Sequence, residues 1–164
     1  MSEDPKRPCL DNFAVTIPDE HLIAIGKVCV AWGTLETIVD LGINKFGGFR
    51  SNDPRALIIT AHMAWPLKMN ILESLITALR EDAAYAHLAG FDQIKPMLEI
   101  AKNGRNSFVH GQWGYHEGKA SKLRATARGK LKASIDPITV ADINKAVDDV
   151  QRAGVALMKL ILNK

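Results

Sequence analysis

The longest stretch of helically spaced apolar positions runs from Asp19 to Phe46. Two acidic residues at its start suit the positive end of a helix, and Gly47-Gly48 supplies a stop after it. The apolar positions are Leu22, Ile25, Val28, Trp32, Leu35, Val39, Ile43 and Phe46. Since they cover much of the circumference, we expect a central helix, or one that faces a second subunit as well as its own core.

Two further helices are predicted in the middle of the chain. One begins at Asp53-Pro54, where a capping residue precedes a proline at the first helical position, and Pro66 must break or kink it. Another opens near Asp92, tolerates Pro96 in its first turn and ends at Gly111. Its apolar face consists of Ile94, Met97, Leu98, Ala101, Phe108 and Val109.

The helical pattern disappears over residues 112–138 and returns for one last helix. Apolar and polar residues alternate there, at Leu123, Ala125, Ala127 and again at Leu131, Ala133, Ile135, which predicts a short antiparallel hairpin turning near Gly129. The last helix begins at Thr139, with Asp142 three residues on, close to a capping box. Its apolar seam consists of Ile143, Val147, Val150, Gly154, Leu157 and Ile161.

These patterns predict a mainly α fold: a bundle of about four helices with a short β-hairpin inserted before the last helix. We expect residues 1–18, which carry three prolines, to be a flexible leader, and residues 19–164 to form a single domain. The chain of 164 residues is long enough for one real core, and 47% apolar with 24% charged residues is ordinary globular composition.

Composition and cysteine use favour a cytoplasmic protein. The start of the chain has no apolar core behind its basic residues, which argues against a signal peptide, and no apolar run approaches the roughly 20 residues of a membrane span. Cys9 and Cys29 are the two cysteines, and they make neither a disulfide framework nor a zinc cluster. A net charge of +3 does not by itself argue for nucleic acid.

Candidate chemistry is concentrated at the end of the third predicted helix. At about 100° per residue, Asn106 and His110 lie on one face, whereas Arg105 points toward the middle of the apolar seam. An unpaired buried guanidinium is costly, so Arg105 needs a carboxylate, a phosphate or a wet cleft at an interface. The negative end of the helix dipole favours a protonated His110, which suits proton transfer near neutral pH. Trp113 and Tyr115 follow and are suited to stack on an unpaired base.

Arg105-Asn106-x-x-x-His110 resembles the Arg-polar-x-x-x-His motif of HEPN domains. The order of elements over most of residues 20–163 is also similar, with Trp32-Gly33-Thr34-Leu35-Glu36 on the long first helix. HEPN domains are small helical domains that commonly dimerise and place the motif at the dimer cleft. Many are metal-independent ribonucleases of toxin–antitoxin, phage-defence and RNA-processing systems, and others only bind or scaffold.

The resemblance implies a metal-independent endoribonuclease that acts as a homodimer, with no cofactor and with an antitoxin or other protein as a further partner. His110 would serve as general base or acid in the attack of the 2′-hydroxyl on the neighbouring phosphate. Arg105 would hold that phosphate and stabilise its developing charge, and Asn106 would orient His110 or donate a hydrogen bond to the phosphate.

The basic residues of the hairpin and Glu36, which lie outside the motif, each have two possible interpretations. A basic run without acids, comprising Lys119, Lys122, Arg124, Arg128, Lys130 and Lys132, is either an RNA-binding ribbon or a solvated hairpin whose lysines protect an edge strand. Glu36 would contact Arg105 or tune His110, or is an ordinary exposed carboxylate. His110, His116 and Glu117 are separated by glycines and have no second cluster, so no metal site is expected.

Two alternatives to catalysis remain open. In one, the same cleft binds a nucleotide, RNA or a partner protein without cleaving it. In the other, the chain is a structural helical dimer in which Arg105 pairs with a carboxylate such as Glu36 or Glu99 and His110 merely caps a helix.

Overall fold

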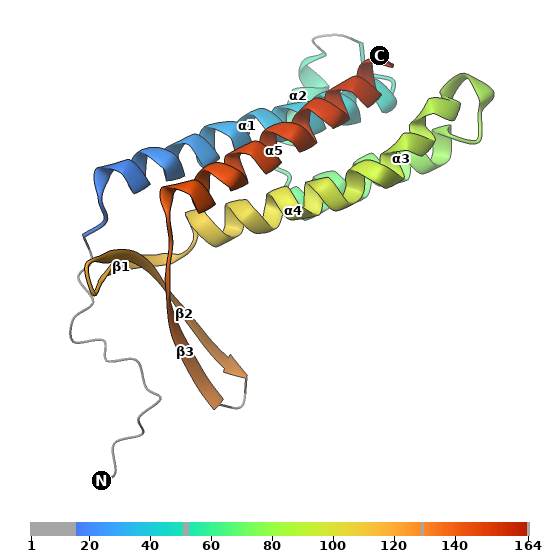
Figure 1. The fold of residues 1–164 in the computed structure, drawn as a ribbon. Helices are drawn as coiled ribbons and strands as arrows, with labels where there is room; N and C mark the ends of the chain where they lie inside the picture. Colours follow the sequence, from blue (N-terminus) through green and yellow to red (C-terminus); the bar gives the residue numbers. More distant parts are fainter. Residues whose placement is uncertain (1–15, 51–52, 129, 164) are drawn as a thin grey trace.

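The computed structural model describes residues 16–50, 53–128 and 130–163, with side chains except at residues 124–133. These residues form α-helices, one 3₁₀ helix and a three-stranded antiparallel sheet (Figure 1). In order, the elements are α1 (Asp19–Phe46), α2 (Pro54–Ala61), α3 (Trp65–Leu79), η2 (Ala83–Gly90), α4 (Phe91–Val109), β1 (Gln112–His116), β2 (Lys119–Arg128), β3 (Lys130–Pro137) and α5 (Val140–Leu162). Most of the predicted leader, residues 1–18, lies outside the described residues.

The long first helix is confirmed with the predicted bounds, and it is central. It packs most extensively against α5 and also contacts α3 and α4, while Figure 1 shows α1 and α5 running side by side in the same direction. The predicted seam of α1 is buried from Val28 to Phe46, whereas Leu22 at its start is half exposed. The six predicted seam positions of α5 are buried as well, so the two seams build the core together.

The second predicted helix is divided at its proline into α2 and α3. Asp53 caps α2 as predicted, because its carboxylate accepts a hydrogen bond of 2.9 Å from the backbone N–H of Arg55. Pro66 lies in the first turn of α3, where its missing N–H costs no helical hydrogen bond. The break therefore orients Trp65 at the beginning of a new helix.

The third predicted helix begins one residue before the expected Asp92, but the predicted place of Pro96 in its first turn is wrong. The 3₁₀ helix η2, which was not predicted, leads directly into α4 at Phe91, so Pro96 lies inside α4 rather than in its first turn. The missing N–H leaves the carbonyl of Asp92 without its helical partner, and both residues are exposed, so water can reach it.

The predicted hairpin is confirmed as β2 and β3 but belongs to a larger sheet. Leu123 pairs with Ile135 and Ala125 with Ala133, and the pairing continues to Arg128 and Lys130. The predicted turn at Gly129 lies outside the described residues. A third strand, β1, was missed; it joins β2 through Glu117 and Gly118, which both have positive φ, as a tight two-residue hairpin requires. The sheet thus begins three residues after α4 ends, and it is fixed to the end of the helix that carries the candidate motif.

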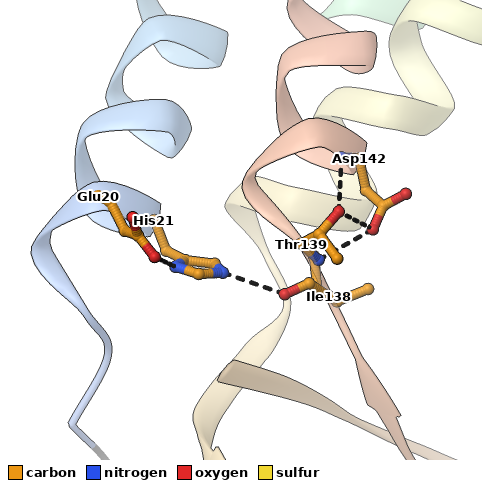
Figure 2. Close-up of polar contacts among 5 residues, drawn as sticks. All are labelled: Glu20, His21, Ile138, Thr139 and Asp142. Atoms are coloured by element: carbon orange, nitrogen blue, oxygen red, sulfur yellow. Dashed lines mark hydrogen bonds and ion pairs between the residues drawn. The ribbon is translucent and has the colours of Figure 1, made fainter. Parts of the chain in front are cut away.

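A buried histidine fixes the first turn of α1 to the junction between the sheet and α5 (Figure 2). His21 is 6% exposed, and its Nε2 donates a hydrogen bond of 3.0 Å to the carbonyl of Ile138. Its Nδ1 lies 3.7 Å from the carboxylate of Glu20. The contact therefore positions the sheet relative to the two central helices.

The capping box of α5 is confirmed, and it carries a pH-dependent prediction. Thr139 accepts from the N–H of Asp142, and Asp142 accepts from the hydroxyl and the N–H of Thr139. The Thr139 hydroxyl and then its backbone N–H lower the pKa of Asp142. We expect Thr139→Ala to reduce the free energy of unfolding by about 1 kcal/mol at pH 7.

This contribution belongs to the ionised carboxylate. Since the folded pKa is depressed, the stability is present above the unfolded value of about 3.9 and is lost as the pH falls through the folded pKa. Urea unfolding at pH 7 and pH 3 measures the difference. Thr37→Ala is the control, because that exposed hydroxyl only donates to the Gly33 carbonyl within α1. A loss for Thr139→Ala that is equal at both pH values would contradict the assignment.

The described helices include one, α1, that is long and apolar enough to cross a membrane by length and composition. Its most apolar 18-residue window has a mean hydropathy of 1.6. In this fold α1 is a core helix, with Val28, Leu35 and Val39 fully buried against its neighbours. The structure is therefore compatible with a soluble protein.

Candidate functional site

The motif lies at the C-terminal end of α4 and includes the residue that caps it. Asn106 begins the last turn, Arg105 directly precedes it, and His110 is the capping residue, whose backbone N–H donates to the carbonyl of Asn106. Asn106 and His110 are exposed, whereas Arg105 is half-buried. This agrees with the sequence expectation that Arg105 turns toward the apolar seam.

The three motif side chains contact one another through the guanidinium. Nη1 of Arg105 donates to Oδ1 of Asn106 at 3.0 Å and also hydrogen-bonds Nε2 of His110. A guanidinium can only donate, so Nε2 accepts. A ring nitrogen that accepts a hydrogen bond in this way has the acceptor property that general-base chemistry uses.

The guanidinium rests on an aromatic surface rather than on a carboxylate. Its central carbon lies 5.6 Å from the centre of the Trp32 ring, within the range of a cation–π contact. Trp32 in turn packs against Trp65 with ring centres 4.3 Å apart. Among the described residues, Arg105 has no carboxylate partner.

Neither of the two carboxylates that the sequence suggested as partners of Arg105 pairs with it in the described structure. Glu99 accepts from Lys102 and from Asn103, and the bond from Lys102 holds the pKa of Glu99 below its usual range. Glu36 is half-buried, and within the described part of the chain it has neither a hydrogen bond nor an ion pair. The closed salt bridge of the purely structural alternative is therefore not formed.

A cavity of about 290 Å³ adjoins the motif. Its lining comes from three helices, with Trp32 and Glu36 from α1, Trp65 and Pro66 from α3, and Lys102, Arg105 and Asn106 from α4. The apolar pattern of the sequence placed Trp32 on a core face and did not single out Lys102. Trp32 is indeed buried, but the spacing of Trp32 and Glu36, one helical turn apart, was a signal that they share a face.

The aromatic residues after the motif differ in their accessibility. Trp113 is half-buried; its Nε1 donates to the carbonyl of Phe108 at 2.8 Å and its ring stacks on that of Phe108. Tyr115 is 38% exposed. Trp113 therefore packs the start of the sheet against α4, and Tyr115 has the more accessible ring.

The basic residues of the hairpin do not form one described surface. Lys122 is 6% exposed and hydrogen-bonds the hydroxyl of Ser107, so it braces β2 against the last turn of α4. Gly111 leaves room for this lysine, because an added Cβ would lie 2.9 Å from Lys122 Cδ and from the Ser107 carbonyl. The side chains of Arg124, Arg128 and Lys130 lie outside the described ones. Figure 1 shows their strands projecting away from the helices.

A larger apolar groove, of about 860 Å³, lies between α1 and α5. Its lining includes Ile23, Gly26 and Val30 from α1 and Val147, Gly154 and Val155 from α5. At about 100° per residue, Val30 and Trp32 are about 200° apart around α1. The groove and the motif cavity therefore lie on different sides of this helix.

Within the described residues, no group of three or more histidine, cysteine, aspartate or glutamate side chains is placed to hold a metal ion. His116 and Glu117 are adjacent at the end of β1 and within the tight turn, away from any third ligand in that set. No family model, curated protein or solved structure is detectably similar to the chain.

Proposed function

We propose that the chain is a HEPN-like, metal-independent endoribonuclease. The observation that supports this most directly is the contact between the Arg105 guanidinium and Nε2 of His110, with Arg105 also lining an aromatic cavity. A cation that binds phosphate and a base that accepts a proton are the two groups that cleavage beside a 2′-hydroxyl needs. The expected setting is the cytoplasm, with a toxin or phage-defence role and an antitoxin or other protein partner.

The proposed cleavage is an internal transesterification at the phosphate. His110 takes the proton of the 2′-hydroxyl, the 2′-oxygen bonds to phosphorus, and the bond from phosphorus to the 5′-oxygen breaks. The 5′-oxygen takes a proton from water or from a second acid. An anionic phosphate oxygen is a better acceptor than a neutral imidazole, so substrate would draw Arg105 away from His110 and release the base. Asn106 then holds the guanidinium from one side.

A non-catalytic binding module is the second candidate, because the cavity and the partner-free Glu36 would also hold a ligand that is not cleaved. In that case RNA affinity survives His110→Ala and falls with Arg105→Ala. A steep loss of affinity with salt would indicate phosphate contacts.

The test of the proposed function is cleavage of varied RNAs in EDTA by the wild type, Arg105→Ala and His110→Ala. Wild-type cleavage that either substitution removes supports the ribonuclease. An inactive wild type, or two variants that cut as well as the wild type, would overturn it.

The proposal includes a homodimer with the motif in the dimer cleft. Light scattering should then give twice the 18.0 kDa mass of one chain. Val30→Asp should leave this mass unchanged, because Val30 is 74% exposed on the groove side of α1, away from the motif. If Val30→Asp is monomeric, the dimer interface lies at the groove between α1 and α5 rather than at the motif. If the wild type is monomeric, the proposed homodimer is wrong.

A further inference from the structure

The motif cavity combines a flat apolar surface with a polar rim. Trp65 is half-buried and Pro66 exposed, and Trp32 beneath them is 5% exposed. The polar lining consists of Glu36, Lys102, Arg105 and Asn106. An accessible indole beside charged groups favours a planar ligand whose edge carries both donors and acceptors.

Glu36 is the polar group of this cavity that still lacks a protein partner among the described residues. Arg105 is engaged with Asn106 and His110, and Lys102 with Glu99. The Glu36 carboxylate is half-buried, so it has lost part of its hydration without gaining a hydrogen bond. Because an ionised carboxylate only accepts, the ligand that relieves this cost must present N–H donors.

The four RNA bases differ in how many donors they offer to one carboxylate. Guanine presents N1–H and the N2 amino group side by side, which match the two carboxylate oxygens. Adenine and cytosine present one amino group beside an acceptor nitrogen, and uracil one N–H between two carbonyl oxygens. Guanine also carries the O6 and N7 acceptors that lysine and arginine bind.

We propose that this cavity is a guanine pocket, in which Glu36 accepts from N1–H and the N2 amino group while the base lies against Trp65. The inference rests on the proposed function for the conclusion that the ligand is part of an RNA. A guanine held there lies beside the phosphate that Arg105 binds, so the pocket selects which phosphate is presented to His110.

The binding test does not depend on cleavage. Guanosine 3′-monophosphate and its adenosine, cytidine and uridine counterparts are titrated while tryptophan fluorescence is followed, since two of the three tryptophans line the cavity. We expect the guanosine nucleotide to bind at least about tenfold more tightly than the others. Glu36→Gln should remove this preference, because the amide replaces one acceptor with a donor.

The matched control is Glu81→Gln, which makes the same change of charge at an exposed residue beyond the far end of α3. It should keep the guanosine preference. Thermal melts check that both variants fold, which is expected because neither carboxylate has a hydrogen-bond partner in the described structure.

Cleavage products separate this inference from the proposed function. Guanosine preference that depends on Glu36, without any cleavage, supports the pocket and overturns the ribonuclease. Cleavage that depends on His110 but ignores guanine, and is unchanged in Glu36→Gln, supports the ribonuclease and overturns the pocket. Equal binding of the four nucleotides also overturns the pocket.

Discussion

His110→Ala is expected to lower the rate of RNA cleavage by about 10²- to 10⁴-fold, which is the usual contribution of a positioned general base. The side chain is exposed at the helix cap, and among the described residues it hydrogen-bonds Arg105. Its removal should therefore leave the thermal midpoint almost unchanged. Single-turnover cleavage of a labelled RNA in EDTA measures the loss.

Three comparisons make this result specific. His116→Ala, at the end of β1, removes a neighbouring imidazole outside the motif and should cleave like the wild type. Arg105→Lys keeps the charge but loses the planar guanidinium, so it should remain impaired. RNA with a 2′-deoxy sugar at the cleavage site should resist cleavage, since the nucleophile is missing. Cleavage of that substrate at the normal rate would contradict the mechanism.

The helices were predictable where their signals are local. Asp53 and Thr139 predict helix starts because their side chains can accept hydrogen bonds from backbone N–H groups two or three residues later. Both hydrogen bonds form in the structure. The seam of α5 follows from periodicity alone, since one face of a long amphipathic helix must be covered. These features depend little on the rest of the chain.

The elements that were missed depend on context. β1 has only five residues, and the turn that makes it a strand is the positive-φ pair Glu117-Gly118 rather than an apolar pattern. The 3₁₀ helix η2 buries Leu88 but has no periodic face that would set it apart from a loop. It leads directly into α4 at Phe91, and Pro96 lies beyond the first turn of that helix.

The candidate site likewise has one part that the sequence predicts and one part that depends on tertiary packing. The positions of Arg105, Asn106 and His110 on α4 follow from helical geometry, and the structure brings them into contact. The surroundings do not, because Trp65 reaches the motif from a helix about 40 residues earlier in the chain. A periodic pattern assigns such a residue to the core, and only the packing of three helices makes it part of a cavity.

Trp32→Ala is the substitution with the largest expected effect on stability, about 3–5 kcal/mol in the free energy of unfolding. Trp32 is 5% exposed within the main core cluster and supports both Trp65 and the Arg105 guanidinium. Against a typical total of about 5–15 kcal/mol, this loss leaves a marginal fold. Urea unfolding followed by circular dichroism measures it.

Trp32→Phe separates the packing role of this residue from its role at the motif. Phenylalanine keeps an aromatic ring in the core, so it should retain most of the stability, yet its smaller face gives Arg105 a weaker cation–π contact. A double-mutant cycle of Trp32→Ala and Trp65→Ala should give a coupling of about 0.5–1.5 kcal/mol, as expected for packed aromatic rings. Because the Arg105 guanidinium lies over the Trp32 ring, Trp32→Phe should lower the rate of RNA cleavage by a larger fraction than it lowers the free energy of unfolding. A variant that loses stability but cleaves RNA at the wild-type rate would show that the platform under Arg105 is dispensable.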